Sequence, residues 1–337
     1  MQNEKILRSG KVDFQILNKF LSSLPQDKSV KIGPGIGIDA AVIKINEEYV
    51  AVKTDPITFT SASLGWYVVN INANDIVCVG AKPCWFLVNL LLPPGEKRNF
   101  LENFFKQLLN ACQELQISLV GGHTEVTSAV NRPIVVGQMI GKIQKDKVIC
   151  NTDAQVGDVI LLTKGLAIEG THVIYQEKQK ELESKISSEF LKRMENFLKN
   201  PGISVVKEAI IATNNANIHC MHDPTEGGLI AGLWEIAVAS GVEISVDWKS
   251  IPIFEETKIL CQIYNFDPLR LLASGALILV VPSSEVDKLM YLYKKAGISC
   301  AKIGEIISNN NVGVKIIKEG KTFFVEHSSR DELTKLF

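Results

Sequence analysis

The chain of 337 residues lacks the uninterrupted apolar stretch of about 18 residues or more that a membrane-spanning helix needs. Its apolar runs, such as residues 277 to 281, have the length of strands. A surplus of charge is also missing, because 36 Lys and Arg face 37 Asp and Glu. This balance argues against a dedicated nucleic-acid binder. We therefore expect no membrane or nucleic-acid partner, and a small molecule as the ligand.

Cysteine is scarce and unpaired in the sequence. The seven cysteines are odd in number and form no CxxC motif, so a disulfide framework is not expected and a reducing compartment suits the chain better. The first residues, MQNEKILRSGKVD, carry charges where a signal peptide has its apolar core. These features predict a cytoplasmic protein.

Strand-like and helix-like blocks alternate along the chain, which indicates a mixed α/β fold. In the first half, the periodicity predicts a strand over 48–55, helices over 64–80 and 96–115, and two strands in SLVGGHTEV and RPIVVGQMIGKI. A polar segment at 151–158 precedes a new strand at 159–163 and marks a domain boundary. We predict domains over residues 1–153 and 154–337.

The second half alternates in the same way. The predicted helices lie near 187–199, 204–214, 227–240 and 284–296, and the predicted strands near 159–163, 243–247, 274–282 and 312–317.

Four acids of the first half have the chemistry of a magnesium site: Asp39, Asp55, Asp75 and Glu125. Mg²⁺ takes oxygen ligands and is usually held by one or two carboxylates together with substrate phosphates. Asp75 lies on a mostly apolar helix, where an unpaired carboxylate is costly, so we expect it to have a partner. The simpler alternatives are a turn at Asp55 before Pro56 and a solvated helix position for Asp75.

Glycine-rich segments could bring backbone N–H groups close to phosphates. Gly33, Gly35 and Gly37 allow such an approach, and the pair Gly121 and Gly122 is a weaker case. Further along, DPTEGGL opens a helix whose free N–H groups could bind an anion. The alternatives are a flexible glycine turn, and an ordinary helix cap by Asp223 or Thr225.

A zinc site at His219, Cys220 and His222 is not favoured, because no second His/Cys cluster supplies a fourth ligand. The remaining cysteines lie in apolar contexts typical of small buried side chains.

Eight motifs in order resemble the aminoimidazole ribonucleotide (AIR) synthase, or PurM-like, superfamily: GIGIDAAVI, KTDPI, NANDIVCVGAKP, GGHTEV, VILLTKGLAIEGT, MHDPTEGGL, GVEI and ASGALILVVP. They span residues 31 to about 305. Within the superfamily, DPTEGGL and the segments IPI and FDPL are similar to the hydrogenase maturation (HypE-like) and AIR synthase-related group.

The resemblance implies an N-terminal α/β domain that dimerises into a shared barrel, and a C-terminal mixed α+β domain. It further implies a homodimer that binds ATP and Mg²⁺ and uses them to phosphorylate or activate an acceptor. Carried over by motif, the implied metal ligands are Asp39, Asp55 and Asp75. The implied nucleotide or phosphate contacts are Asn74, Gly121, Gly122, His123, Thr124, Thr225, Gly227 and Gly228, with Asp223 as the catalytic residue.

The chain departs from the family pattern at three points. Ile38 precedes Asp39 where a second acid is frequent, His123 stands where HypE-like proteins usually carry Asp, and the printed sequence ends RDELTKLF without the terminal Cys of those proteins. Selenophosphate synthetase is disfavoured, because residues 1 to 77 contain no Cys. Two alternatives stay open: a thiamine-monophosphate kinase-like enzyme, and a non-catalytic dimeric assembly protein.

Overall fold

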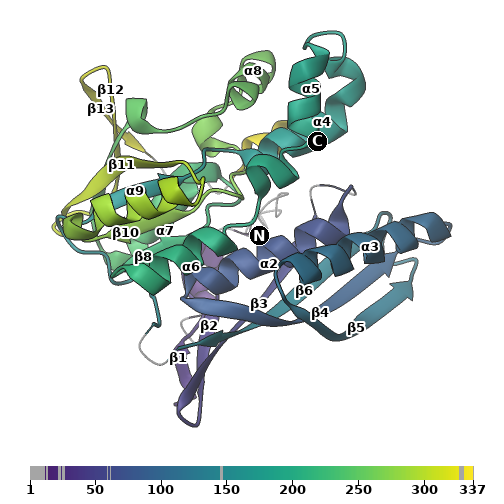
Figure 1. Cartoon of the computed structure of the whole chain (residues 1–337), viewed down its shortest axis with the longest axis horizontal. Coiled ribbons are helices and arrows are strands. Elements are labelled where there is room, and N and C mark those ends of the chain that lie inside the picture. The colour runs from purple at the N-terminus through teal and green to yellow at the C-terminus, as the bar shows by residue number, and fades with distance from the viewer. Residues whose placement is uncertain are drawn as a thin grey trace, which may run out of the picture.

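The structure is a computed structural model that describes residues 12, 14–21, 24, 27–58, 60, 62–144, 147–325 and 330–336. The chain forms two sheets, one in each half, and helices that include α2 and α6 lie between them (Figure 1). A short helix, α1 (Phe14–Leu21), precedes the first sheet. Among the described residues no helix combines the length and apolarity needed to span a bilayer.

The first sheet has six strands in the order β1, β2, β3, β6, β4, β5. Neighbouring strands are antiparallel, except β4 and β5, which are parallel. The strands are β1 (Val30–Ile32), β2 (Ala41–Ile45), β3 (Glu48–Ile57), β4 (Ala81–Leu92), β5 (Ser118–Val126) and β6 (Ile134–Ile143).

The strand bounds correct two local predictions. Strand β3 runs through Asp55 and Pro56 to Ile57, so the alternative of a turn at Asp55 is wrong. Gly121, Gly122, His123 and Thr124 lie inside β5, so they do not form a turn. A glycine pair within a pleated strand still adds two residues that bring no side chain to the sheet surface.

Helices α2 (Leu64–Cys78) and α3 (Arg98–Glu114) pack against each other, and α2 lies on the sheet against β3 and β6. Helix α2 also contacts α6 and β8 of the second half, so it is buried on every side (Figure 1). A helix in this position cannot expose its polar residues to water, and each of them needs an internal partner.

The crossing of α2 and α3 depends on Gly65. A Cβ atom at this position would lie 2.3 Å from the carbonyl oxygen of Phe104 and 2.8 Å from the amide nitrogen of Leu108. We therefore expect Gly65→Ala to push the helices apart and to lower the free energy of unfolding by about 1–3 kcal/mol. Urea unfolding followed by circular dichroism measures this loss. Gly121→Ala is the control, because its Cβ meets only a Leu87 methyl group at 3.7 Å; equal losses would contradict the steric account.

The second sheet has seven strands in the order β13, β12, β9, β11, β7, β10, β8. Only β12 and β9 are parallel. The strands are β7 (Val159–Thr163), β8 (Cys220–His222), β9 (Glu243–Asp247), β10 (Ile278–Val281), β11 (Cys300–Ser308), β12 (Gly313–Lys318) and β13 (Lys321–Val325). Strands β7 and β10 are buried throughout, which explains their continuous apolar sequences.

The helices of this half are α4 (Ile168–Leu182), α5 (Ser188–Glu195), α6 (Val206–Asn215), α7 (Gly228–Ser240), α8 (Glu255–Tyr264) and α9 (Val286–Lys295). The structure confirms the four helices predicted from periodicity. It adds α4 and α8 and the strands β8, β11 and β13, and it shortens the strand predicted over 274–282 to β10.

Candidate active site

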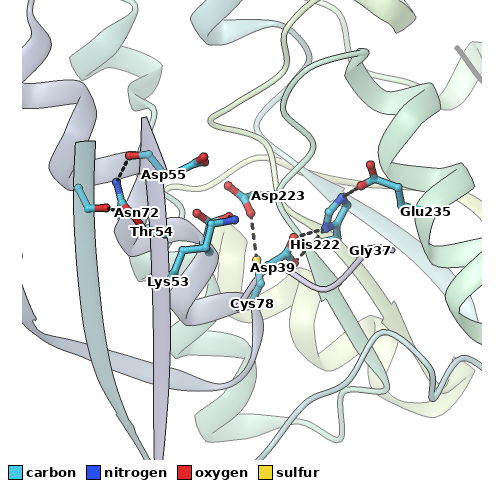
Figure 2. Close-up of polar contacts among 12 residues, drawn as sticks. Gly37, Asp39, Lys53, Thr54, Asp55, Asn72, Cys78, His222, Asp223 and Glu235 are labelled. Carbon is cyan, nitrogen blue, oxygen red and sulfur yellow. Dashed lines mark hydrogen bonds and ion pairs between the residues drawn. The ribbon is translucent and has the colours of Figure 1, made fainter. Parts of the chain in front are cut away.

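Acidic side chains from both halves meet where α2 and β3 face the end of β8 (Figure 2). Strand β3 places Lys53 and Asp55 on the same face, two residues apart. Asp39 lies in the loop before β2, and His222 and Asp223 lie at the end of β8. The described cluster comprises Asp39, Lys53, Asp55, Asp75, Cys78, His222, Asp223 and Glu235.

Lys53 and Asp75 form an ion pair, with Nζ and Oδ1 3.4 Å apart. Asp75 is 4% exposed, and its Oδ2 has no hydrogen-bond partner among the described residues. Burial lowers the pKa of Lys53, but the surrounding carboxylates, chiefly Asp75 and Asp55, outweigh burial and raise it above its usual value. Burial raises the pKa of Asp75, and Lys53 opposes that rise. Asp75 has the partner that the sequence predicts, and the alternative of a solvated position is wrong.

His222 is engaged through both ring nitrogens, and its Nδ1 contact joins the two halves. Its Nδ1 lies 2.7 Å from Oδ1 of Asp39, and its Nε2 lies 2.9 Å from Oε2 of Glu235 on α7. Burial lowers the pKa of His222, but Asp39 and Glu235 raise it well above its usual value. With both nitrogens donating, His222 is an imidazolium that fixes the orientation of the Asp39 carboxylate.

Asp223 and Cys78 form the fourth contact of the cluster, with Sγ 3.5 Å from Oδ1. Oδ2 of Asp223 has no hydrogen-bond partner among the described residues. Burial raises the pKa of Asp223 to about 7, with a further contribution from the charge of Asp39. Burial also raises the pKa of the Cys78 thiol well above its usual value, and the neighbouring carboxylates add to this effect.

The glycine loop before β2 lies against α7 beside this cluster. Gly37 has φ +63°, and a Cβ there would lie 2.9 Å from the carbonyl oxygen of Glu235. The Gly37 carbonyl accepts a hydrogen bond from Nδ2 of Asn151 at 2.6 Å. This position therefore requires glycine for both its conformation and its close contact. Gly35 is less restricted, because its nearest neighbour is Ile38 of the same loop at 3.2 Å.

The segment Gly121–Thr124 is not part of the buried cluster. The strand registers align Asp55 with Gly137, Gly137 with Val88, and Val88 with Gly122. Gly122 therefore lies in the row of Asp55 but three strands away, which is about 14 Å. His123 on this strand is exposed and pairs with Glu125 at 3.1 Å.

Two further predicted contacts are engaged within the protein. Asn74 donates Nδ2 to the Ile203 carbonyl at 2.8 Å and accepts from the Val205 amide at 2.9 Å, so it ties α2 to the segment before α6. At the start of α7, the Gly227 amide donates to Oδ2 of Asp331 at 2.8 Å. The Gly227 N–H group, which we predicted to bind an anion, thus already donates to a carboxylate of the C-terminal segment.

The three residues considered for zinc do not converge. His219 pairs with Asp158 at 2.7 Å, Cys220 lies near the Cys150 carbonyl at 3.6 Å, and His222 belongs to the Asp39 contact. Within the described part of the chain, the group with metal-binding geometry is a different one: Asp39, Cys78 and Asp223.

A further buried acid, Glu169, lies in the first turn of α4 and is 6% exposed. Burial raises its pKa to about 8. The folded state therefore keeps a proton that the unfolded state loses from pH 4.5 upward, so stability falls between pH 4.5 and about 8 and then levels off.

We expect Glu169→Gln to remove this pH dependence. The quantity to compare is the free energy of unfolding of the variant minus that of the wild type. This difference should be larger at pH 8 than at pH 5, by up to about 4 kcal/mol. Urea titrations at both pH values measure the difference. Glu183→Gln, at an exposed position just after α4, is the control. Parallel curves for wild type and Glu169→Gln would rule out the buried neutral acid.

Sequence reasoning missed Lys53 and Glu235 and used His222 only for zinc. Lys53 lies in strand β3, and the alternation of apolar and polar residues along a strand does not predict a charged partner on a helix. The signal that could have found it is Asp75 itself, because a buried acid requires a nearby cation.

Two family models match the chain. The model described as AIR synthase related protein, N-terminal domain, matches residues 37–143, and the model for the C-terminal domain matches residues 155–317. The chain belongs to the AIR synthase-related family. It is a PurM-like family of ATP-using enzymes that includes carbamoyl dehydratases and thiamine-monophosphate kinases.

Relatives of both kinds are similar at low identity. A putative hydrogenase expression/formation protein of Methanocaldococcus jannaschii is 26% identical over 275 residues, 78% of each chain. The carbamoyl dehydratase HypE of Cupriavidus necator is 24% identical, over 83% of this chain and 78% of its own. A thiamine-monophosphate kinase of Buchnera aphidicola is 27% identical, over 94% of this chain and 97% of its own.

Solved structures share the fold. The structure of a HypE–HypF complex matches with a TM-score of 0.76 at 22% identity, over 93% of this chain and 99% of the other. HypE in complex with ATP matches with a TM-score of 0.69 at 21% identity, over 93% and 91%. The two sheets thus correspond to the N- and C-terminal domains of PurM-like proteins.

Proposed function

We propose that this protein is a Mg²⁺-dependent, ATP-using enzyme of the HypE-like group that phosphorylates or otherwise activates an acceptor. The observation that carries the proposal is the buried cluster of Asp39, Asp75 and Asp223 beside Lys53, formed by both halves of the chain. Buried carboxylates are costly unless a cation compensates them. The unpartnered Oδ2 atoms of Asp75 and Asp223 fit such a cation.

The chain's residues would divide the work by charge. Asp39, Asp55 and Asp75 would hold Mg²⁺, which neutralises phosphate charge when bound. Lys53 offers a fixed ammonium group at the same place, and Asp223 would face the acceptor as the catalytic residue. Phosphoryl transfer depends mainly on positioning and charge neutralisation, so a rigid cluster of this kind suits it.

The proposed nucleotide contacts lie partly away from the cluster. Gly35 and Gly37 flank it, whereas Gly121, Gly122, His123 and Thr124 lie on the exposed strand β5. Asn74, Thr225, Gly227 and Gly228 complete the proposed set, and a nucleotide would have to displace the present hydrogen bonds of Asn74 and Gly227. These groups could serve one nucleotide if two copies pair through their first sheets, as a homodimer would.

The open face of the first sheet supports this dimer. The residues that point away from α2 include Trp85, Leu87, Val136 and Ile140, which are only half-buried in the single chain. Half-buried apolar side chains on a sheet face are typical of an interface. We propose domain bounds of 1–153 and 154–337 for the pairing and C-terminal units.

A thiamine-monophosphate kinase-like activity is the second candidate. It is favoured by one observation: the alignment with such a kinase runs over 94% of this chain, against 78% for the archaeal hydrogenase-related protein. Each relative is about equally distant in identity, so the acceptor decides between them.

The test is calorimetric titration of ATP with and without Mg²⁺, followed by hydrolysis assays alone and with thiamine monophosphate. Mg²⁺-dependent binding at two sites per dimer and ATP turnover are expected. Thiamine diphosphate as product would select the kinase. Tight binding without turnover under any of these conditions would point to the non-catalytic assembly protein, and no binding at millimolar ATP would refute the proposal.

A further inference from the structure

Cys78 is the one thiol that faces the acidic cluster in the described part of the chain. It is the last residue of α2 and is 1% exposed. Its Sγ and single carboxylate oxygens of Asp39 and Asp223 all lie within 4.8 Å of one another (Figure 2). We propose that these three residues bind a divalent transition-metal ion of the zinc type, through one thiolate and two carboxylates.

The geometry agrees with this coordination. A tetrahedral zinc-type ion with a metal–sulfur bond of about 2.3 Å and a metal–oxygen bond of about 2.0 Å separates the sulfur and oxygen atoms by about 3.5 Å. The observed separation of Cys78 Sγ and Asp223 Oδ1 is 3.5 Å. Three protein ligands leave the fourth position open to water or to substrate.

The charges around the three ligands also call for a divalent ion. Five carboxylates, those of Asp39, Asp55, Asp75, Asp223 and Glu235, face two cationic side chains, Lys53 and His222. Fully ionised, this group carries three uncompensated negative charges. The Oδ2 atom of Asp223 is buried and has no hydrogen-bond partner among the described residues, so it is available to a cation.

The ligand orientation is already fixed. His222 holds the Asp39 carboxylate at 2.7 Å and is itself held by Glu235. Hydrogen-bonded supports of this kind set the direction of metal ligands and increase affinity. His222 is not a ligand itself, since both ring nitrogens are engaged.

The thiol decides which metal is preferred. Mg²⁺ takes oxygen ligands, whereas thiolate favours zinc-type ions over hard cations. On binding, the S–H bond of Cys78 breaks, the proton passes to the buffer, and the sulfur bonds to the metal. Asp39 and Asp223 also belong to the proposed ATP site, as a magnesium ligand and as the catalytic residue, but this inference requires neither ATP nor turnover.

The experiment is a titration of the nucleotide-free, full-length protein with Co²⁺, followed by absorption spectroscopy. We expect a thiolate-to-Co²⁺ charge-transfer band in the near ultraviolet that saturates at one ion per chain. Added Zn²⁺ should abolish the band, and a large excess of Mg²⁺ should not. Cys78→Ser should lose the band and bind Zn²⁺ at least about tenfold more weakly.

Cys112→Ser is the matched control, because Cys112 is a buried thiol of α3 outside the cluster, and this variant should keep the band. Should Cys78→Ser not fold, the ¹¹³Cd resonance of the wild-type protein reports directly whether sulfur is a ligand. Co²⁺ bound without a charge-transfer band, a band that survives Cys78→Ser, or no Co²⁺ binding would each overturn the site. None of these results bears on Mg²⁺-dependent ATP hydrolysis, which is measured separately.

Discussion

Asp75→Asn is expected to weaken Mg²⁺-dependent ATP binding by about 30-fold or more. The change removes one of the carboxylates proposed to hold Mg²⁺ and leaves the Lys53 ammonium without its partner at 3.4 Å. Loss of one partner of a buried charge pair in a binding site typically costs about 2–5 kcal/mol of binding free energy, which corresponds to roughly 30-fold to several-thousand-fold in affinity. The fold should persist, because Asp39, Asp55 and Asp223 still compensate Lys53.

Calorimetric titration of ATP in the presence of Mg²⁺ measures this effect. Asp247→Asn is the control: it removes an exposed carboxylate at the end of β9 that caps a short turn through the Lys249 amide. That variant should bind ATP like the wild type. Unchanged affinity in a folded Asp75→Asn protein would remove Asp75 from the metal site.

Local patterns predict most of the fold, because hydrophobic periodicity reports which face of an element is buried. The predicted strand over 48–55 and helix over 64–80 correspond to β3 and α2. Helix α4 was not predicted, because its first half is buried on all sides and its second half is exposed. Its apolar residues therefore do not repeat along one face. Strand β8 has only three residues, which is too short for a period to emerge.

The sequence predicts the acidic residues of the candidate site but not its cationic residues. A carboxylate on an apolar helix needs a partner, and this expectation identified Asp75. The sequence could not name Lys53 or His222 as the cations, because each pairing joins elements far apart in the chain. The same limit applies to Gly122, whose row alignment with Asp55 emerges only from three strand registers.

Lys53→Met is expected to lower the free energy of unfolding by about 2–3 kcal/mol at pH 7. This is less than a fully buried pair would lose, because the Lys53 side chain is 23% exposed and water screens part of the interaction. The folded-state pKa of Lys53 lies above its unfolded value of 10.5, so its contribution is fully present below pH 10.5 and is lost as the pH rises through the higher value. Urea unfolding at pH 7 therefore measures the whole effect.

A double-mutant cycle shows whether the ion pair itself is responsible. If Lys53 acts mainly by compensating Asp75, adding Asp75→Asn to Lys53→Met should restore stability, with a coupling energy of at least about 1 kcal/mol. Lys44→Met is the control, since Lys44 pairs with Glu47 at the surface and should cost at most about 0.5 kcal/mol. If the effects of the two substitutions simply add, Lys53 compensates the remaining carboxylates as a group. The Asp75 carboxyl is then neutral in the folded protein. This agrees with burial, which raises the pKa of Asp75.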